Sequence, residues 1–378
     1  MKKILFVVDE NKIGGVSIVL EDILNNISIN NYDITLLILH NNGDRFKNIP
    51  KSVKIIYGGS IFDKIDMPLI EAYKSKKLKI ITSKLFLLFL MKTKLIKLAI
   101  KKERKKLLKE TYDIEIAFKY GFTTIFTYYG NTPTKINWVH TDCKMFDPAI
   151  NYRKYFKKIL SKFTYNVLLS SNIEKNFNEI YKCHNTIIIN NIVDENRIKK
   201  QINNDIKYLN DSKFRLLTVG RLTRAKGYDN LIDALNNLKH LNIELDIIGS
   251  GELEEHLKEK ALNYKLNNIK FFGKKDAPFE NANKYDLFIL SSIYEAYPGV
   301  IIESFISGIP VLSTDIAASS EMIDSRYGIV CKSTTNDLVN YIKKIYNKEI
   351  DISILKNNLK EYKYNNKEII KKIENILK

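Results

Sequence analysis

Hydrophobic residues along this chain fall in short, nearly continuous runs, and each run is followed by a loop and then by a stretch with helical spacing. In the first half, two such runs occupy residues 3–8 and 33–40. In the second half they occupy residues 214–219, 244–249, 269–273, 286–290 and 310–314. Apolar runs that alternate with amphipathic helices are typical of parallel sheets with helices on both faces. The pattern therefore predicts the α/β class, with one doubly wound sheet in each half.

Helical stretches follow most of these runs, and a polar segment separates the two halves. The expected helices occupy residues 17–26, 229–238, 252–262, 299–307 and 366–378. The polar segment covers residues 196–212, just before the strand pattern restarts. We predict an N-terminal domain at 1–200, a C-terminal domain at 213–360, and a terminal helix within 361–378 that could return to the first domain.

The composition is that of an ordinary globular protein. Of 378 residues 45% are hydrophobic, which is enough apolar material for two or three cores and argues against disorder. The three cysteines are odd in number and far apart, which fits a reducing compartment better than a disulfide framework. The apolar run at the N-terminus is short and ends in Asp9 and Glu10, so we expect a strand rather than a signal peptide and a cytoplasmic location.

Much of the net charge of +18 comes from one segment, residues 74–110, which holds 14 Lys or Arg and two Glu. Its apolar residues mingle with the lysines at helical spacings: Ile80, Leu85, Leu88, Leu95 and Leu98. A basic, partly amphipathic helical region is typical of binding to an anionic membrane surface. The alternative is a helical pair packed on its own domain with a solvated lysine face. Nucleic acid is disfavoured because no recognised binding fold or aromatic stacking array is present.

Two glutamates follow the strand predicted at 286–290. Glu295 lies on the loop after this strand, and Glu303 lies in the next helix, which Pro298 can start because its first turn needs no amide donor. Gly299 leaves the helix amino end open to a phosphate group. By itself the spacing of Glu295 and Glu303 favours a loop carboxylate and a surface helix carboxylate over two ligand-binding carboxylates.

Cations and glycines follow two other strands of the second half. Arg221 and Lys226 lie on the loop after residues 214–219, and two cations at the carboxyl end of a strand suit a diphosphate. A solvated loop explains them equally well. Gly249 and Gly251 form an incomplete dinucleotide fingerprint, which predicts a tight strand-to-helix turn and lets a ligand approach the backbone.

The first half has two candidate positions for ligand contacts. Gly14 and Gly15 follow the first strand, where they let a helix amino end approach an anion. His140 ends an apolar run and could donate to an oxyanion or a sugar hydroxyl, although a structural histidine is the commoner case. His140 and Cys143 have no second ligand pair, and the chain has no Asp-x-Asp triplet, so we expect no metal site.

Three motifs taken in order resemble the GT-B glycosyltransferases, specifically family 4, the retaining glycosyl transferases group 1. They are VGRLTRAKG at 219–227, IIGSGELEEHL at 247–257 and SIYEAYPGVIIESFISGIPVLSTD at 292–315. The first half is similar more weakly, through Gly14, Gly15 and the sequence WVHTD at 138–142. Ala296 departs from the pattern, since many members have Gly there. The resemblance implies two Rossmann-like domains that face each other across a cleft, with the nucleotide sugar held mainly by the second.

The resemblance also implies a role for each motif residue. Arg221 and Lys226 would neutralise the donor diphosphate, and Glu303 would accept the ribose hydroxyls. Glu295 and His140 would act at the reacting centre, where Glu295 holds the hydroxyls of the donor sugar. The other donor-binding positions would be Gly15, Gly249, Tyr297, Pro298, Gly299 and Val300. No cofactor or metal is required, since the nucleotide sugar is a substrate.

These expectations describe a hexosyltransferase-type enzyme at the inner face of the plasma membrane. It would move a sugar from a nucleotide diphosphate, UDP by preference, to a lipid-linked surface glycan such as capsular polysaccharide or O-antigen. Its expected partners are that donor, that glycan acceptor and an anionic membrane surface bound through residues 74–110, with no nucleic acid. The alternatives are a GT-B nucleotide-sugar epimerase and a non-catalytic basic protein that binds membranes or nucleic acid.

Overall fold

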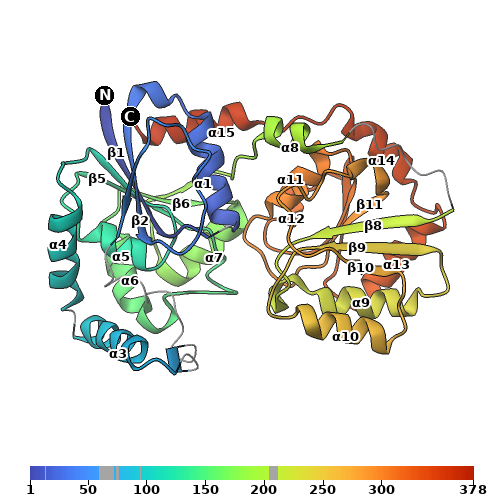
Figure 1. Cartoon of the computed structure of the whole chain (residues 1–378). Helices are drawn as coiled ribbons and strands as arrows, with labels where there is room; N and C mark the ends of the chain where they lie inside the picture. The colour runs from blue at the N-terminus through green and yellow to red at the C-terminus, as the bar shows by residue number, and fades with distance from the viewer. Residues whose placement is uncertain (13, 59–71, 74–75, 94, 204–211) are drawn as a thin grey trace. The chain divides into compact units, whose positions relative to one another are not determined.

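The computed structural model describes residues 1–12, 14–58, 72–73, 76–93, 95–203 and 212–378. The chain forms two compact units, one of residues 1–192 with 367–378 and one of residues 193–366. Figure 1 shows each unit as a sheet with helices packed around it. The predicted α/β class with two parallel sheets is therefore confirmed.

The first unit contains a seven-stranded sheet in the order β3-β2-β1-β4-β5-β6-β7, and its strand pairs are parallel. Its strands are β1 (Lys2–Glu10), β2 (Tyr32–His40), β3 (Lys54–Tyr57), β4 (Ile114–Ala117), β5 (Thr134–Trp138), β6 (Tyr165–Leu168) and β7 (Thr186–Ile188). Its helices are α1 (Gly15–Asn26), η1 (Ile29–Asn31), α3 (Leu78–Lys92), α4 (Ile96–Leu107), α5 (Phe122–Tyr128), η3 (Ile150–Tyr152), α6 (Arg153–Leu160), α7 (Ser171–Tyr181) and, from the end of the chain, α15 (Asn366–Ile376).

The second unit contains a six-stranded parallel sheet in the order β10-β9-β8-β11-β12-β13. Its strands are β8 (Phe214–Val219), β9 (Ile243–Ile248), β10 (Ile269–Phe271), β11 (Leu287–Leu290), β12 (Val311–Thr314) and β13 (Gly328–Cys331). Its helices are α8 (Glu195–Gln201), η4 (Arg224–Lys226), α9 (Tyr228–Asn237), α10 (Glu254–Asn263), η5 (Ala282–Lys284), α11 (Gly299–Ile306), α12 (Ser319–Met322), α13 (Thr335–Tyr346) and α14 (Ile352–Leu359).

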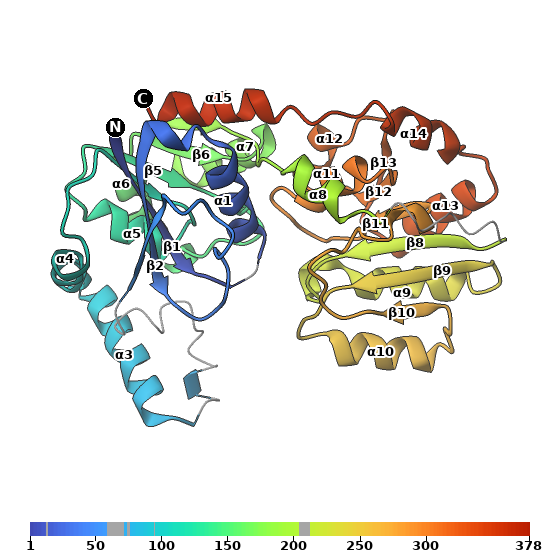
Figure 2. The same cartoon turned by 45° about the horizontal axis from the view of Figure 1, so that its top comes forward.

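Both faces of the second sheet are buried, which explains its continuous apolar strands. Consecutive strand residues point to opposite faces, so Leu216 packs in one hydrophobic cluster with α9, α10 and α13, while Leu217 packs in another with α11. Figure 2 shows these helices on the two sides of β8, β9 and β11. Each fully buried leucine contributes about 2 kcal/mol to the free energy of unfolding.

Strand order reverses at one place in each sheet. Each chain segment builds outward from its first strand through two further strands, and then returns to the other side of that first strand. The reversal therefore lies between β1 and β4 in the first unit and between β8 and β11 in the second. Loops at the carboxyl ends of the two strands diverge at such a point, which is where open α/β sheets bind their ligands.

The two units divide before α8 rather than within the polar segment at 196–212. Ile198 of α8 packs against Val193 and Ile302, so α8 belongs to the second unit, whereas its polar composition led us to place residues 1–200 in the first. Part of the predicted boundary, residues 204–211, lies outside the described residues. At the other end of the chain, α15 is grouped with the first unit, where the Glu374 carboxylate accepts a hydrogen bond from the Ser28 amide at 3.1 Å.

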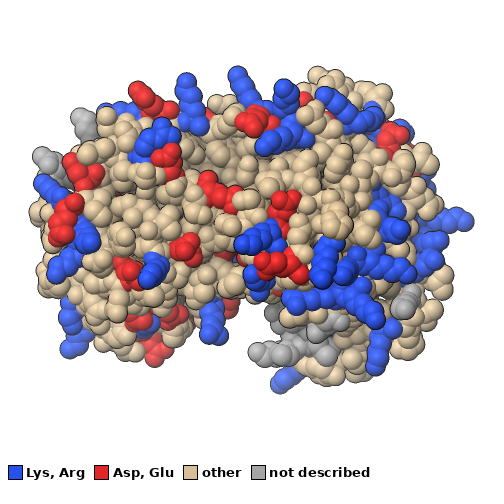
Figure 3. Space-filling model, turned by 180° about the vertical axis from the view of Figure 1, so that it is seen from behind, with Lys and Arg blue, Asp and Glu red and all other residues tan. Residues whose placement is uncertain are grey.

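The basic segment at 74–110 forms the helices α3 and α4, apart from residues 74, 75 and 94, which lie outside the description. One side of the pair is buried through Leu87, Leu90, Ile96 and Ile100. Other apolar side chains are exposed: Leu78, Leu85, Phe86, Phe89, Leu95 and Leu98. Figure 3 shows Lys and Arg gathered on the side of the first unit where these helices lie. None of the described helices is long and apolar enough to cross a membrane.

Candidate functional site

The loops after β8 and β11 are joined by backbone contacts at the strand-order reversal of the second sheet. The amide of Ile293 donates to the Ala225 carbonyl at 2.8 Å. Gly227 has a φ of +64°, and a Cβ added there would lie 2.1 Å from the Ser291 carbonyl oxygen. Glycine is therefore needed at this position both for its backbone conformation and for the close approach of the two loops.

A second glycine, Gly249, lets the loop after β9 pack closely against the loop after β8. Gly249 has a φ of +151°, and an added Cβ would lie 1.8 Å from the Gly220 carbonyl oxygen. The structure thus shows why Gly249 stands in this strand-to-helix turn, because any side chain would push the loops after β8 and β9 apart. Its suggested contact with a nucleotide stays a prediction.

Lys226 and Glu295 form an ion pair between these loops. The Lys226 ammonium contacts Glu295 Oε1, and the Ser292 hydroxyl donates to the same oxygen at 2.8 Å. Both charged side chains are less than one-fifth exposed. The sequence motifs imply Lys226 at the diphosphate and Glu295 at the sugar. They do not predict that the two side chains contact each other. Sequence reasoning also missed Ser292, although a hydroxyl three residues before a loop carboxylate at a strand end is a usable signal.

Arg221 lies on the same loop as Lys226 but has a different environment. Its side chain is exposed, and none of the ion pairs found among the described residues involves it. This loop therefore presents the solvent-facing guanidinium of Arg221 and an ammonium, that of Lys226, which already has a carboxylate partner. An incoming anion can pair with the Arg221 guanidinium directly. At Lys226 it would share the ammonium with the Glu295 carboxylate.

Glu303 lies in the middle of α11, the helix that follows the loop after β11. Its Oε1 accepts a hydrogen bond from the Arg197 guanidinium at 3.2 Å, and its side chain is 13% exposed. Arg197 comes from α8, far away in the sequence, and no local pattern indicated it. No described hydrogen bond or ion pair joins Glu303 to Glu295, so the two carboxylates hold separate partners.

The amino end of α11 carries the remaining predicted donor-binding residues. Pro298 is the N-cap, as the sequence predicts, and the first-turn amides of Gly299 and Val300 have no partner within the helix. A Cβ at Gly299 would meet only Val193 at 4.0 Å, so local packing does not require glycine there. The Tyr297 hydroxyl lies 3.0 Å from that of Tyr364, and burial raises the pKa of Tyr297 to about 12.

His140 follows β5 in the first unit and lies against aromatic rings. Its ring is 4.9 Å from that of Phe118 and lies parallel to that of Trp138 at 6.3 Å. Burial, together with the nearby Lys119 ammonium, lowers the pKa of His140 to about 3. The imidazole is therefore neutral at physiological pH. Its Nε2 atom is buried and has no hydrogen-bond partner in the described part of the chain.

Other groups at the carboxyl edge of the first sheet are paired. Asp9 at the end of β1 contacts Lys119 just after β4, which the sequence analysis missed although both residues follow neighbouring strands. Asp142 is buried and accepts a hydrogen bond from the Asn176 side chain at 3.0 Å, which makes it a structural residue of its loop. Gly15 begins α1, and a Cβ there would meet nothing within 4 Å.

Burial raises the pKa of the Cys143 thiol, so it is a poor metal ligand at neutral pH. No group of three or more His, Cys, Asp or Glu side chains with the geometry to hold an ion occurs in the described ranges.

Residues 199–366 match the model of the family described as glycosyl transferases group 1. Among curated proteins, the O-antigen biosynthesis glycosyltransferase WbnH of Escherichia coli is 32% identical over 134 residues, which cover 35% of this chain and 38% of that protein. A Campylobacter jejuni enzyme, the N-acetylgalactosamine-N,N'-diacetylbacillosaminyl-diphospho-undecaprenol 4-alpha-N-acetylgalactosaminyltransferase, is 28% identical over 48% of this chain and 53% of its own. The chain thus spans about half or less of the curated relatives it matches.

Solved structures match over the whole chain. Anabaena HepE in complex with UDP and glucose has a TM-score of 0.70 and 17% identity, and covers 100% of this chain and 99% of its own. At this identity the likeness concerns the fold alone. The fold is GT-B, with two Rossmann-like domains, as the sequence motifs had implied.

Proposed function

We propose, from the match of residues 199–366 to the model of the glycosyl transferases group 1 family, that this chain is a retaining family 4 glycosyltransferase. It would transfer a hexosyl group from a UDP-sugar to a glycan acceptor. The observation that carries the proposal is the Lys226–Glu295 pair, on the same loop as the exposed Arg221, at the strand-order reversal of the second sheet. A similar fold that holds UDP and glucose supports UDP as the nucleotide.

The cations would act on the diphosphate leaving group. The bond between the anomeric carbon and the diphosphate oxygen breaks as the acceptor oxygen bonds to the same face of that carbon, and a phosphate oxygen takes the acceptor proton. Negative charge then develops on the diphosphate, where Arg221 and Lys226 stabilise it more in the transition state than in the ground state. Because these two residues supply the positive charge, we propose that the reaction uses no metal.

The carboxylates would position the donor at its two ends. When Lys226 turns to the diphosphate, Glu295 and Ser292 become available to the hydroxyls of the sugar. Glu303 would accept the ribose hydroxyls, in part exchanging its contact with Arg197. The amides of Gly299 and Val300, which have no partner within the helix, would donate to the phosphate or sugar oxygens.

His140 would act as a neutral hydrogen-bonding group. Its lowered pKa makes it unsuited to general acid catalysis, because the protonated form is scarce at neutral pH. A buried Nε2 that has no hydrogen-bond partner among the described residues can serve a substrate hydroxyl. Gly15 would let the first turn of α1 approach the donor phosphates, since space is open around it.

The acceptor would be lipid-linked, in the assembly of a surface glycan such as O-antigen or capsular polysaccharide. Relatives named for O-antigen biosynthesis and for a diphospho-undecaprenol substrate support this class. The α3–α4 pair, with exposed apolar side chains among lysines, would hold the enzyme at the inner face of the plasma membrane.

Liposome flotation tests the membrane part of the proposal. Intact protein is expected to float with vesicles of anionic phospholipid at low salt. Replacing four exposed lysines of α4 by Gln, at 101, 102, 105 and 106, should reduce the bound fraction, since each basic residue contributes about 1 kcal/mol near such a surface. The control replaces four exposed lysines of the second unit, at 239, 265, 274 and 348. Equal loss in both variants, or no flotation, contradicts the membrane part alone.

A panel of nucleotide sugars tests the enzymatic part. We expect one UDP-sugar to raise the melting temperature and to be hydrolysed slowly without an acceptor, with retention at the anomeric carbon. A change in sugar stereochemistry without hydrolysis would instead identify an epimerase. Failure of every nucleotide and nucleotide sugar to bind would contradict the transferase and favour a non-catalytic binder.

A further inference from the structure

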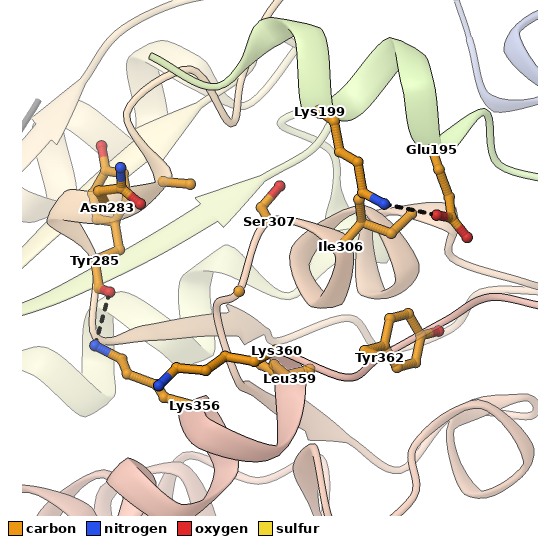
Figure 4. Close-up of a pocket in the computed structure, with 12 residues that line it drawn as sticks. Glu195, Lys199, Asn283, Tyr285, Ile306, Ser307, Lys356, Leu359, Lys360 and Tyr362 are labelled. Atoms are coloured by element: carbon orange, nitrogen blue, oxygen red, sulfur yellow. Dashed lines mark hydrogen bonds and ion pairs between the residues drawn. The ribbon is translucent and has the colours of Figure 1, made fainter. Parts of the chain in front are cut away.

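A pocket of about 450 Å³ lies in the second unit, at the edge of the sheet opposite to Arg221 and Lys226. Tyr285 and Gly308 line it and come just before β11 and β12, so it lies at the amino ends of these strands. Figure 4 shows its walls, which come from α8, η5, the carboxyl end of α11, and α14. None of the residues assigned to the donor lines this pocket.

A buried hydroxyl without a partner faces this pocket. Ser307 is 8% exposed, and its Oγ has no hydrogen-bond partner among the described residues. Figure 4 shows the hydroxyl extending into the space between Asn283 and Lys199. A buried hydroxyl left without a hydrogen bond costs about 1–3 kcal/mol, so a polar occupant that bonds to it would stabilise the site.

Lysines define one wall of the pocket. Lys356 and Lys360 are four residues apart at the end of α14, so their side chains lie on one face, and Figure 4 shows both extending toward Tyr285. The Lys356 ammonium is 3.1 Å from Asp286 Oδ1, whereas that of Lys360 donates to the neutral side chain of Asn357 at 3.1 Å. This wall therefore keeps an ammonium group with no carboxylate partner in the described part of the chain.

The opposite wall is suited to hydroxyl groups rather than to an anion. Lys199 is neutralised by Glu195 at 3.0 Å. Ser307 and Asn283 offer neutral hydrogen-bonding groups, and the carboxyl end of α11 contributes carbonyl oxygens that accept hydrogen bonds. The partial negative charge at this helix end opposes an anion near α11, while the Lys360 ammonium, which has no carboxylate partner among the described residues, attracts one near α14.

We propose that this pocket binds a phosphate monoester that carries hydroxyl groups, with the phosphate at Lys356 and Lys360 and the hydroxyls at Ser307 and Asn283. A phosphate monoester is an anion at neutral pH, which suits the Lys360 ammonium together with the Lys356 ammonium that it would share with Asp286. The pocket exceeds the size of a phosphate ion alone, and Ile306, Leu359 and Tyr362 supply apolar surface for a carbon ring or chain.

Calorimetry with glucose 6-phosphate as the probe tests this site on the full chain. We expect one binding site, weaker binding of inorganic phosphate and no binding of glucose. Lys360→Gln should weaken glucose 6-phosphate binding about tenfold, since it removes a charged contact. Ser307→Ala should weaken it about threefold and leave the melting temperature of the free protein unchanged or higher, because the hydroxyl has no partner to lose. The control Lys239→Gln, an exposed lysine of the same unit, should bind as the parent does.

Four outcomes would overturn the proposal. They are no binding of glucose 6-phosphate, equal binding of glucuronate, unchanged affinity in both Lys360→Gln and Ser307→Ala, and displacement of glucose 6-phosphate by UDP. The last would place the ligand at the donor loops. A chain that binds glucose 6-phosphate at this pocket but no nucleotide sugar would refute the proposed enzyme and leave this site standing.

Discussion

The two sheets of this chain share a strand order but present different chemistry at their carboxyl edges. In the second unit, the loops after β8, β9 and β11 are joined through Gly227 and Gly249, and charged side chains meet between them. In the first unit, the corresponding edge places a neutral His140 among the rings of Phe118 and Trp138.

The difference shows how one topology supports two kinds of recognition. Loops that contact one another through their backbones can hold an ammonium and a carboxylate in a fixed arrangement, which suits a charged diphosphate. A strand end surrounded by aromatic rings excludes water and keeps an imidazole neutral, which suits an uncharged hydroxyl. The carboxyl edge of the second sheet is thus suited to charged groups. The carboxyl edge of the first sheet is apolar around His140, whose Nε2 is the hydrogen-bonding atom described there.

Removing the Lys226 ammonium is expected to have the largest effect. Lys226→Ala should lower kcat by about 10²–10³, the loss typical of one group that stabilises developing charge. Arg224→Ala is the matched control, because Arg224 is an exposed cation on the same short helix and has no proposed role. Steady-state kinetics with the preferred UDP-sugar measure both. Parent-like turnover in Lys226→Ala would show that the second edge does not act through its charge.

Filling the space at Gly249 should separate the loops of the second edge. Gly249→Ala places a methyl group against the Gly220 carbonyl and is expected to lower the free energy of unfolding by about 3 kcal/mol. Gly273→Ala is the control, since Gly273 also has a positive φ but open space around it, and should cost about 1 kcal/mol. Urea denaturation compares them. Equal losses would mean that the loops are not held together by this close approach.

Acid should destabilise the first edge through His140. The pKa of His140 is about 3 in the folded chain and about 6.5 when unfolded, so only the unfolded state takes up this proton between those values. The contribution of the neutral His140 ring to the free energy of unfolding is complete above pH 6.5. As the pH drops toward 3, that free energy falls by up to about 1.4 kcal/mol per pH unit. His140→Gln should remove this dependence in urea titrations at pH 7.5, 6 and 5. Parallel pH curves for the two proteins would show that the imidazole is not held neutral.

The smallest effect is expected at Glu303. Glu303→Ala should weaken UDP binding about tenfold, because it removes a charged acceptor for the ribose hydroxyls. Arg197→Ala removes the present partner of Glu303 but not the carboxylate, and UDP affinity should be retained. Calorimetric titration with UDP measures both. If Arg197→Ala weakens UDP binding as much as Glu303→Ala does, the Arg197–Glu303 contact has a structural role and the Glu303 carboxylate does not bind the ribose hydroxyls.

Local patterns predicted the strands and loops well where neighbours in the sequence decide the structure. The strand at residues 214–219 has the bounds of β8, and Pro298 is the N-cap of α11, at the helix start that the sequence predicts. The boundary between the units was less predictable. Residues around α8 are polar, and only the packing of Ile198 against Ile302 shows that they belong to the second unit. Composition reports what a segment is made of and not which distant side chain covers it.

The sequence by itself determined the alternation of strands and helices and the residues that stand at the strand ends, because these follow from periodicity and from the backbone preferences of Gly and Pro. Only the tertiary structure decided which of those residues meet. The pairing of Lys226 with Glu295 and the neutral state of His140 each depend on groups far away in the chain. So does the burial of the Ser307 hydroxyl, which has no partner among the described residues. Burial and Coulomb energy depend on distance in space, and a linear pattern of residue types does not contain that distance.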